Sequence, residues 1–521
     1  MSHQPTGSPS GCLWAFSVLA MRKFFIILYV FSAIQYANAQ IGFKKVFDID
    51  EVGLAFSSME YNGDHTVTIY GNLINQGLEY GLLFASFDTL GNLLNYQVMY
   101  DSLGDVPTLN FPNSFIKLAD GSGYAGIGTY FFREKGFLAI YNNDGSIRKF
   151  VEYPNTDVLA SFYIEIFEIS DGFFILGDKQ LQDGFSRIFL IKTDKKGNKL
   201  WEKRYGMAPP RENGYGGIVK INDNEYVIGG ASTTIPTTPQ IVYNTSNFYV
   251  IDSLGNIKSS WDSQPSTTDM GVGYGLQRTE QGGWLYSTNE LYFGPPNYLY
   301  ERKLKIIERD INYDIVTERT YGQFGRNNVL QNFKKLSSGN YLILGQRAVK
   351  KTPPPPYTYT GLLMGSMFNI TSTGDSVWNY LDTAFTFASN LLYDAVELPS
   401  GSIIACGYSR TTNILKDWAW LVKVSKDGCV DTLNCISVSS FESSNPSSKM
   451  RVYPNPTSDV IYLDLPNDDE TTYQIFTIQG RVVMSGRVLK NAVDVSALLP
   501  GGYLLLVQSK HGTVTKKIIK T

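Results

Sequence analysis

The chain has 521 residues, of which 18% are charged and 14% aromatic, and its formal net charge is −3. So few charges, without clustered Lys and Arg, exclude an electrostatic footprint for nucleic acid. The length calls for two or more domains or one large repeat array, and the aromatic residues and 48 glycines favour an all-β protein.

Residues 1–39 have the pattern of a secretory signal peptide, with a leader extension before Met21. The short basic segment Met21–Lys23 precedes the apolar run Phe24–Ile34. The small residues that follow predict cleavage between Ala39 and Gln40. The apolar run is too short to span a membrane, which takes about 20 residues. After cleavage we expect an exported chain without an integral membrane span.

A turn-like motif recurs along residues 40–435 at intervals of 52 to 62 residues. Its marker residues are Gly91, Gly145, Gly197, Gly255, Asn312, Gly374 and Gly428. A second punctuation, in which turn residues precede a short apolar run and Gly, keeps step with the first. Each unit then divides into four short runs without helical periodicity, which indicates strands. Seven such units predict a seven-bladed β-propeller.

The two ends of this array predict how the ring closes. The last unit has no obvious fourth strand, whereas Phe43–Asp50 near the mature N-terminus resembles the fourth strands of other units. We therefore expect this N-terminal segment to complete the last blade. That pairing removes two open sheet edges.

The recurring turn can be a site or a scaffold. The residues three positions before the markers are Asp88, Asn142, Asp194, Asp252, Arg309, Thr371 and Ser425. Because several are not carboxylates, the copies cannot share a carboxylate metal site or acid chemistry. Asp, Asn, Ser and Thr side chains instead accept hydrogen bonds from the turn backbone, and Gly or Asn tolerates positive φ. We interpret the turn as scaffold.

Two of the turns resemble a motif of quinoprotein propellers. Gly197–Trp201 and Gly374–Trp378 match the G-x-x-x-W pattern, in which Trp packs between blades. The Asp boxes of sialidase-type propellers are also similar, but their spacing differs by one residue. Neither resemblance brings a cofactor pocket to this chain.

The inventory of reactive side chains is small. The mature chain has only His65 and His511, so zinc sites and Ser-His-Asp triads are poorly supported. The sequence therefore assigns no catalytic residue, no metal ligand and no cofactor, and it predicts that the protein is not an enzyme. Carboxylates for glycosidic hydrolysis would have to converge from different blades, and the sequence does not name such a pair.

Three long loops and a cysteine pair remain. The loops Thr233–Asn247, Tyr292–Arg302 and Val349–Thr360 combine Pro with Tyr, which suits either a recognition rim for a glycan or protein, or rigid insertions. Cys429 and Cys435 are close enough in sequence to form a disulfide in an oxidising compartment.

The C-terminal part divides into a Ser-rich linker, 436–449, and a small domain, 450–521. Short strand-like runs predict that this domain is a compact Ig-like β-sandwich. Its motifs resemble, in order, the C-terminal sorting domain (type A) of the type IX secretion system. The residues that carry the resemblance are Tyr453, Pro454, Asn455, Pro456, Gly480, Asp494, Gly501, Tyr503, Lys516 and Lys517.

The resemblance implies partners and a location. They are the outer-membrane translocon, a sortase-like peptidase that removes the domain, and surface lipopolysaccharide if the cargo is attached and not released. We therefore expect a secreted or cell-surface propeller that binds a glycan or protein. The alternative is an extracellular carbohydrate-active hydrolase with carboxylates at a propeller face. A third alternative is a matrix component without a dedicated ligand.

Overall fold

The computed structural model describes residues 42–430 and 452–521, apart from short connecting segments. The segments left out within these ranges are 48–52, 75–79, 101–106, 109–111, 131–134, 156–157, 210, 235–242, 268–272, 274, 294–299, 322–327, 351–358, 383–387, 412–416, 465–470, 478–481, 490 and 510–511. The predicted signal peptide and linker lie outside the described residues. Across the described ranges the regular elements are all strands, and none is a helix that would cross a membrane.

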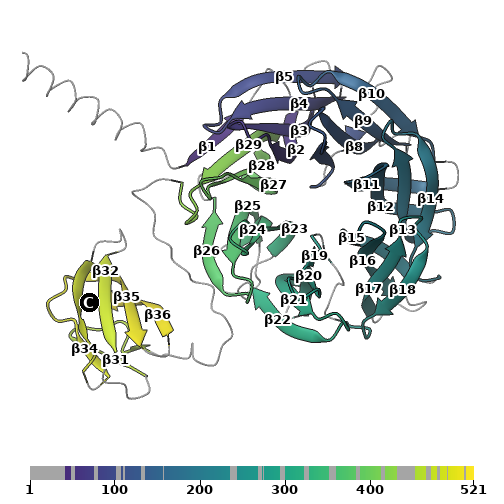
Figure 1. The fold of residues 1–521 in the computed structure, drawn as a ribbon. Coiled ribbons are helices and arrows are strands. Elements are labelled where there is room, and N and C mark those ends of the chain that lie inside the picture. The colour runs from purple at the N-terminus through teal and green to yellow at the C-terminus, as the bar shows by residue number, and fades with distance from the viewer. Residues whose placement is uncertain are drawn as a thin grey trace, which may run out of the picture.

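Seven sheets follow one another around a ring, and we number them blade 1 to blade 7 (Figure 1). Blades 1 and 2 consist of β2 (Gly53–Tyr61), β3 (Thr66–Ile74), β4 (Tyr80–Asp88) and β5 (Leu93–Tyr100), then β6 (Pro107–Thr108), β7 (Phe115–Lys117), β8 (Tyr124–Tyr130), β9 (Lys135–Tyr141) and β10 (Ile147–Tyr153). Blades 3 and 4 consist of β11 (Val158–Ile169), β12 (Gly172–Leu181), β13 (Ser186–Asp194) and β14 (Lys199–Tyr205), then β15 (Arg211–Asn222), β16 (Glu225–Thr234), β17 (Tyr243–Asp252) and β18 (Ile257–Asp262).

The remaining blades repeat the pattern. Blades 5 and 6 consist of β19 (Gln277–Arg278), β20 (Trp284–Phe293), β21 (Tyr300–Arg309) and β22 (Ile315–Tyr321), then β23 (Asn328–Lys335), β24 (Tyr341–Lys350), β25 (Tyr359–Ile370) and β26 (Ser376–Leu381). Blade 7 consists of β27 (Ala388–Glu397), β28 (Ile403–Thr411), β29 (Asp417–Val424) and β1 (Phe43–Phe47). In each blade the first strand in this order lines the centre of the ring and the last lies at the rim (Figure 1). The all-β class predicted from the sequence is confirmed.

Blade 7 joins the two ends of the array, as the sequence predicted. β1 pairs antiparallel with β29, from Phe43 opposite Lys423 to Phe47 opposite Ala419. An ion pair reinforces this closure, because the Lys44 Nζ lies 2.9 Å from the fully buried Asp382 carboxylate at the end of blade 6. The N-terminal strand therefore contacts both blades at the junction.

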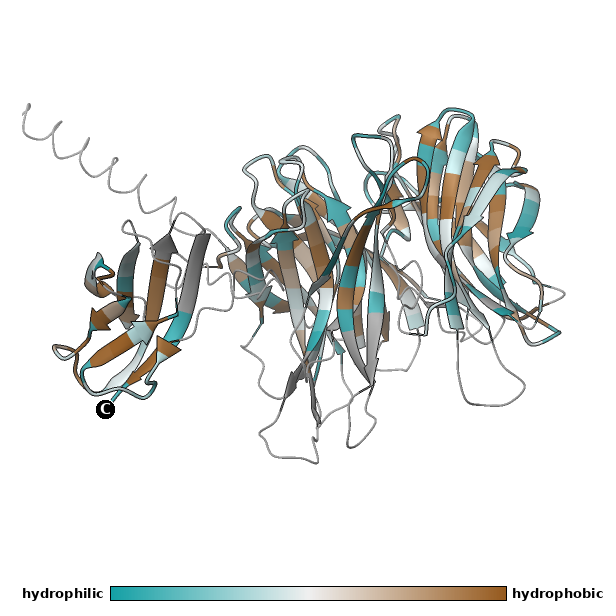
Figure 2. Ribbon diagram, turned by 90° about the horizontal axis from the view of Figure 1, so that it is seen from below, coloured by the Kyte–Doolittle hydropathy of each residue, from teal (hydrophilic) through white to brown (hydrophobic). Residues whose placement is uncertain are grey.

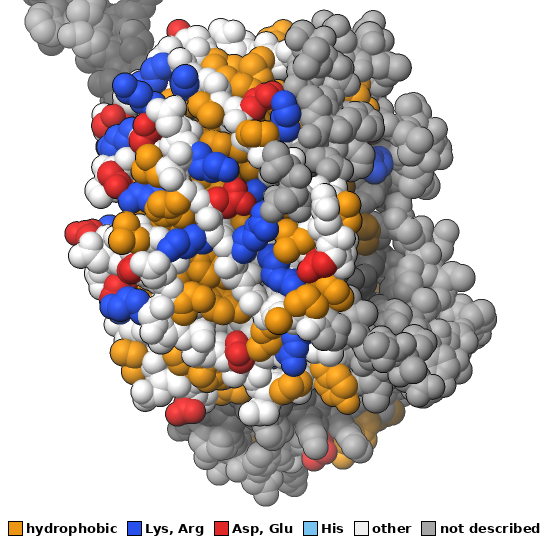
Figure 3. Space-filling model, turned by 90° about the vertical axis from the view of Figure 1, so that its right-hand side faces the viewer, with side chains coloured by type: hydrophobic (Ala, Val, Ile, Leu, Met, Phe, Trp, Pro, Cys, Tyr) orange, Lys and Arg blue, Asp and Glu red, His pale blue; other side chains and the backbone are white. Residues whose placement is uncertain are grey.

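The hydrophobic core lies between neighbouring blades. One cluster combines Leu176 and Leu190 of blade 3 with Ile228 and Ile251 of blade 4, and all four side chains are essentially inaccessible to solvent. The hydrophobic bands along the middle strands are visible in Figure 2. On the outer face shown in Figure 3, Lys and Arg, Asp and Glu, and hydrophobic side chains are mixed, without one dominant sign of charge. The faces of each sheet are buried by the neighbouring blades, so the ring is stable only as an assembled array.

The recurring turn is a scaffold, as predicted, with one correction in blade 5. At Gly197 φ is +82°, and the Asp194 carboxylate accepts hydrogen bonds from the backbone N–H of Lys196 and Asn198, each at 2.8 Å. The sequence placed the marker of blade 5 at Asn312, but Tyr313 has the positive φ, +68°. Asp310 caps that turn in place of Arg309.

The marker glycines also contact side chains of the preceding blade. A Cβ at Gly255 would lie 2.6 Å from the Trp201 ring, so only Gly fits. In blade 7 the Trp378 indole of blade 6 packs on Gly428 and donates to the Lys426 carbonyl oxygen at 2.8 Å. Each of these two turns therefore packs against a Trp side chain of the preceding blade.

The cysteines are partly accounted for. Cys406 is a fully buried free thiol of β28, and burial raises its pKa well above the usual range. Cys429 is disulfide-bonded. Since Cys435 lies outside the described residues, the Cys429–Cys435 pairing stays a prediction.

The C-terminal region is a two-sheet sandwich. One sheet has the order β30 (Val452–Tyr453), β31 (Val460–Leu463), β34 (Ala492–Asp494), and the other β33 (Val482–Arg487), β32 (Thr472–Thr477), β35 (Gly501–Ser509), β36 (Gly512–Lys520). Between them lie Ile461, Ile475, Leu505 and Ile518, each 0% exposed. The sandwich has its own core, as expected for a separate domain.

Candidate functional site

The strands that line the centre of the ring carry a bulge at matching positions. In β2, β11, β15, β23 and β27 the pairing register shifts by one residue. The residues directly after the shift are Ser58, Glu165, Gly217, Asn332 and Asp394. A bulge bends its strand and re-aims side chains, and bulges are common next to active sites. Of these five residues, Ser58, Asn332 and Asp394 are buried between blades, whereas Glu165 and Gly217 line a cavity described below.

Asp394 of blade 7 holds three blades together at this level. Its carboxylate accepts hydrogen bonds from Ser58 Oγ at 3.0 Å, Met59 N at 2.9 Å, Asn332 Nδ2 at 2.9 Å and Ala395 N at 2.8 Å. Lys334 also forms an ion pair with it. The carboxylate is 1% exposed, so it is a fixed anchor and does not face an open cavity.

Glu60 lies beside this anchor and has an unusual acidity. It follows Ser58 by two positions in β2, so both side chains point to the same side of the strand. Burial raises the pKa of Glu60 to about 7, opposed by the Lys334 ammonium and reinforced by the Asp394 carboxylate. Burial alone would lower the pKa of Lys334, but Asp394 outweighs it and the pKa is raised. The pKa of Glu60 thus lies close to neutral pH, where the carboxyl group changes between its protonated and ionised forms.

A cavity of about 310 Å³ opens in the channel next to this group. Its walls come from several blades and include Glu165 of β11, Gln277 of β19 and Lys334 of β23. The volume is at the lower end of the range for small-ligand sites. Lys334 lines this cavity, pairs with Asp394 and interacts with Glu60, which is not itself a lining residue.

Two carboxylates therefore lie on different walls of the channel. Strand β11, which carries Glu165, faces β27 across the ring, and β2 with Glu60 lies beside β27 (Figure 1). Glu165 lines the cavity, whereas Glu60 interacts with the cavity residue Lys334. A carboxylic acid and a second carboxylate are the groups that hydrolyse glycosidic bonds. In the part of the chain that the structure describes, no three His, Cys, Asp or Glu side chains approach closely enough to hold a metal ion.

A second cavity, of about 280 Å³, lies between blades 4 and 5. Its aromatic wall is Trp261, which stacks on Tyr313 with ring centroids 5.2 Å apart. The Arg309 guanidinium lies 4.6 Å from the Trp261 ring centroid. Because its ring is already packed on both partners, this Trp is part of the blade interface.

Among the ten sorting-motif residues, Asn455, Asp494 and Tyr503 form hydrogen bonds through their side chains. The Asn455 amide donates to the Lys517 carbonyl oxygen and accepts from Ile519 N, each at 2.8 Å. The Tyr503 hydroxyl donates to the Leu499 carbonyl oxygen at 2.8 Å. Asp494 caps Ser496 N at 2.9 Å.

The other predicted site residues are spread more widely. Tyr453, Pro454 and Pro456 are exposed at the start of the domain, and Gly501 begins β35. Lys516 and Lys517 lie in β36. Outside the described residues lie Gly480, the predicted cleavage site Ala39–Gln40 and the central parts of the three long loops.

Sequence reasoning missed Glu60, Glu165, Lys334 and Asp394. A signal was present, because each is a charged residue in the innermost, largely apolar run of its repeat, such as LLYDAVE and FYIEIFEI. The bulges that bring them to the channel leave no comparable mark in the sequence.

The comparisons with known proteins concern both parts of the chain. Residues 451–521 match the family model of the secretion system C-terminal sorting domain. A curated relative, beta-agarase D of Zobellia galactanivorans, is 29% identical over 132 residues, which cover 24% of this chain and 27% of the relative. The chain thus spans about a quarter of the length of this relative.

Solved structures resemble the propeller at low identity. The polysaccharide lyase Uly1 is 10% identical with a TM-score of 0.41, and the match covers 71% of this chain and 90% of that chain. The β-propeller domain of the Trilobed protease from Pyrococcus furiosus is 11% identical with a TM-score of 0.39, over 71% and 95% of the two chains.

These comparisons correct the prediction that the protein is not an enzyme. The finding behind the correction is the curated relative, which is named as an agarase. The physical reason for the error is that the search covered local motifs, and such a search does not detect groups that come from different blades.

The C-terminal match and the sandwich agree with each other and with the motif order. The chain therefore ends in a type IX secretion system sorting domain, and the protein is a β-propeller cargo that this system exports to the cell surface or extracellular space.

Proposed function

We propose that this protein is an extracellular carbohydrate-active hydrolase whose active site is the central channel. Glu60 is the proton donor and Glu165 the second carboxylate. The observation that carries the proposal is a cavity lined by Glu165 and Lys334, together with Glu60, which interacts with the same Lys334 and whose pKa burial raises to about 7. Export supports it, because a polysaccharide outside the cell is accessible only to an exported enzyme.

The chemistry follows from the two environments. Glu60 donates its proton to the glycosidic oxygen, and the bond from that oxygen to the anomeric carbon breaks. Glu165 either attacks the anomeric carbon or activates the water whose hydroxyl joins it, depending on the separation of the two carboxyl groups. Lys334 and Asp394 position Glu60, and Lys334 also lines the cavity in which the substrate binds.

The named activity of the agarase relative makes agarose the first substrate to test. The full mature protein is incubated with agarose and a panel of other galactans and uronate polymers, and new reducing ends are measured. We expect Glu60→Gln to lower the rate by about 100-fold or more. Glu152→Gln is the matched control, since Glu152 lies on the rim strand β10 in an exposed ion pair with Lys135. Equal rates for the two variants, or no activity on any polymer, would contradict the proposal.

A further inference from the structure

A row of exposed apolar side chains crosses the outer face of the three-stranded sheet in the sorting domain. Pairing places Tyr453 opposite Tyr462, Tyr462 opposite Ala492, and Ala492 opposite Leu489. Residues that lie directly opposite in an antiparallel pair share one face. Tyr453 is 54% exposed, Tyr462 46% and Leu489 72%. The two Tyr rings stack with centroids 6.0 Å apart, and we call these three residues the aromatic row.

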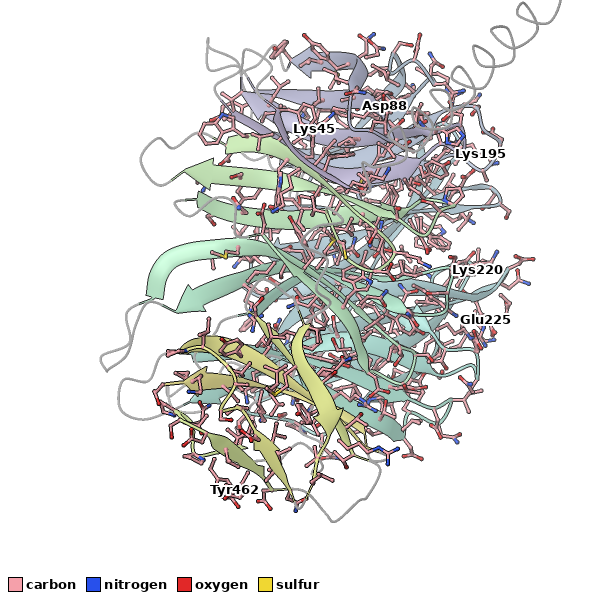
Figure 4. All side chains as sticks on the ribbon, turned by 90° about the vertical axis from the view of Figure 1, so that its left-hand side faces the viewer. Lys45, Asp88, Lys195, Lys220, Glu225 and Tyr462 are labelled. Atoms are coloured by element: carbon pink, nitrogen blue, oxygen red, sulfur yellow. The ribbon has the colours of Figure 1, made fainter. Side chains whose placement is uncertain are left out.

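The fold of the domain does not require this row. The neighbours Ile461 and Val493 point to the opposite face and fill the core, at 0% and 2% exposed. An antiparallel sheet with one solvated face normally presents polar side chains on that face. Tyr462 instead projects from the outer surface of the sandwich (Figure 4).

The sorting-motif residues likewise fall into those that hold the fold together and those that are exposed. Asn455 and Tyr503 fold the domain through the hydrogen bonds described above, whereas the Tyr453 side chain is largely free of the core. The Asn455 amide also fixes the adjacent part of β36, where Lys517 and Ile519 are exposed. A cationic and apolar rim thus borders one end of the aromatic row.

We propose that the aromatic row is the surface through which a protein of the type IX secretion machinery binds this domain. Tyr and other aromatic residues are enriched in protein interfaces and dominate their binding energy. Domains of this family direct a protein to the secretion system, so a protein of that system must recognise and bind the domain; we call this protein the reader. The chemistry of the row fits an apolar groove on that reader, with acidic groups facing Lys517.

A second copy of this chain is a poorer fit. A stable protein interface buries about 800 Å² on each partner, which three side chains do not supply. A secretion protein that binds its cargo only transiently can use a smaller interface that dissociates readily. The experiment separates these occupants.

The full chain is expressed in a host that has the secretion system, and its amounts in the periplasm and outside the cell are measured. We expect the double variant Tyr453→Ser, Tyr462→Ser to reduce export by about tenfold or more and to accumulate in the periplasm. The matched control is Val482→Ser, Val483→Ser, because these residues are 47% and 38% exposed on the edge strand β33 of the other sheet. Normal export of the row variant, or equal loss in both variants, would overturn the proposal.

A second measurement keeps the test independent of folding. A photoreactive phenylalanine replaces Tyr462, or Val483 in the control, in the otherwise unchanged chain. Crosslinking at position 462 to an outer-membrane protein of the secretion apparatus, absent at position 483, is the expected result. Crosslinks to a second copy of the chain, or to no apparatus protein, would contradict the proposal.

Discussion

The hydroxyl of Tyr205, at the end of β14, donates a hydrogen bond to the carbonyl oxygen of Gly255, 2.8 Å away in the turn of the next blade. Tyr153 makes the same bond to Gly197 at 2.7 Å, and Tyr321 to Gly374 at 2.5 Å. The bond connects the rim strand of one blade to the marker residue of its neighbour. The turn that repeats in the sequence is therefore the joint between blades.

Removing one of these bonds tests that interpretation. Tyr205→Phe leaves the Gly255 carbonyl without its buried donor, so we expect a loss of about 1 kcal/mol in the free energy of unfolding. Urea denaturation measures it. Tyr243→Phe, at a Tyr that is 41% exposed, is the control and is expected to unfold like the wild type. A Tyr205→Phe variant of unchanged stability would show that the joint depends on packing alone.

Ring closure depends on the buried partner of Lys44. Lys44→Met leaves the fully buried Asp382 carboxylate without its cation, and we expect a destabilisation of roughly 3 kcal/mol. Adding Asp382→Asn to the same chain removes the buried negative charge and restores part of the loss. Lys195→Met, at an exposed turn, is the control for loss of one positive charge (Figure 4). Additive effects of the two closure substitutions would contradict the pairing.

The pKa of Glu60 predicts how stability changes with pH. Because its folded-state pKa of about 7 lies above the usual 4.5, the folded protein binds the proton more tightly than the unfolded chain. Stability contributed by Glu60 is complete below pH 4.5 and is lost as the pH rises to 7. Glu60→Gln removes this titration, so the variant becomes more stable than the wild type as the pH rises, by up to roughly 3 kcal/mol. Parallel stability curves for the two proteins would show that Glu60 titrates normally.

The two carboxylates predict different pH profiles of activity. A proton donor with a pKa of about 7 makes the wild-type rate fall on the alkaline side of neutrality. Glu165→Gln is expected to lower the rate by about 100-fold or more while leaving that alkaline limb in place. Measuring the rate from pH 5 to 9 for both proteins tests the assignment. If Glu165→Gln moves the alkaline limb, the roles of the two residues are reversed.

The predicted disulfide has a simple signature. If Cys429 and Cys435 are partners, Cys429→Ser and Cys435→Ser lower the melting temperature equally, and the double variant falls no further. The loss corresponds to roughly 2 kcal/mol, because the bridge closes a short loop. Peptide mass mapping without reductant identifies the linked pair directly. A bridge from Cys429 to another residue would refute the pairing.

The architecture was predictable because it depends on local patterns of residues that repeat along the sequence. Turn residues such as Gly197 recur in phase with short apolar runs, and the N-terminal strand resembles the strand that it replaces. The marker in blade 5 was misplaced by one residue, since Asn312 has the better turn propensity but Tyr313, stacked on Trp261, takes the positive φ.

The channel was not predictable because it depends on contacts between residues that are far apart in the sequence. Ser58 and Asp394 meet in a 3.0 Å hydrogen bond although they are 336 positions apart in the sequence. Their approach depends on ring closure and on the bulges, and each bulge is a backbone irregularity without its own residue pattern. The acidity of Glu60 then follows from burial, which a single sequence does not report.

The most direct test of the account is a crystal structure of the Glu60→Gln variant with an oligosaccharide from a polymer that the wild type degrades. The account predicts a sugar ring in the channel cavity, with a glycosidic oxygen within hydrogen-bonding distance of residue 60 and Glu165 on the other side of the ring. A sugar bound only at the rim or between blades 4 and 5, with the channel unoccupied, would contradict it.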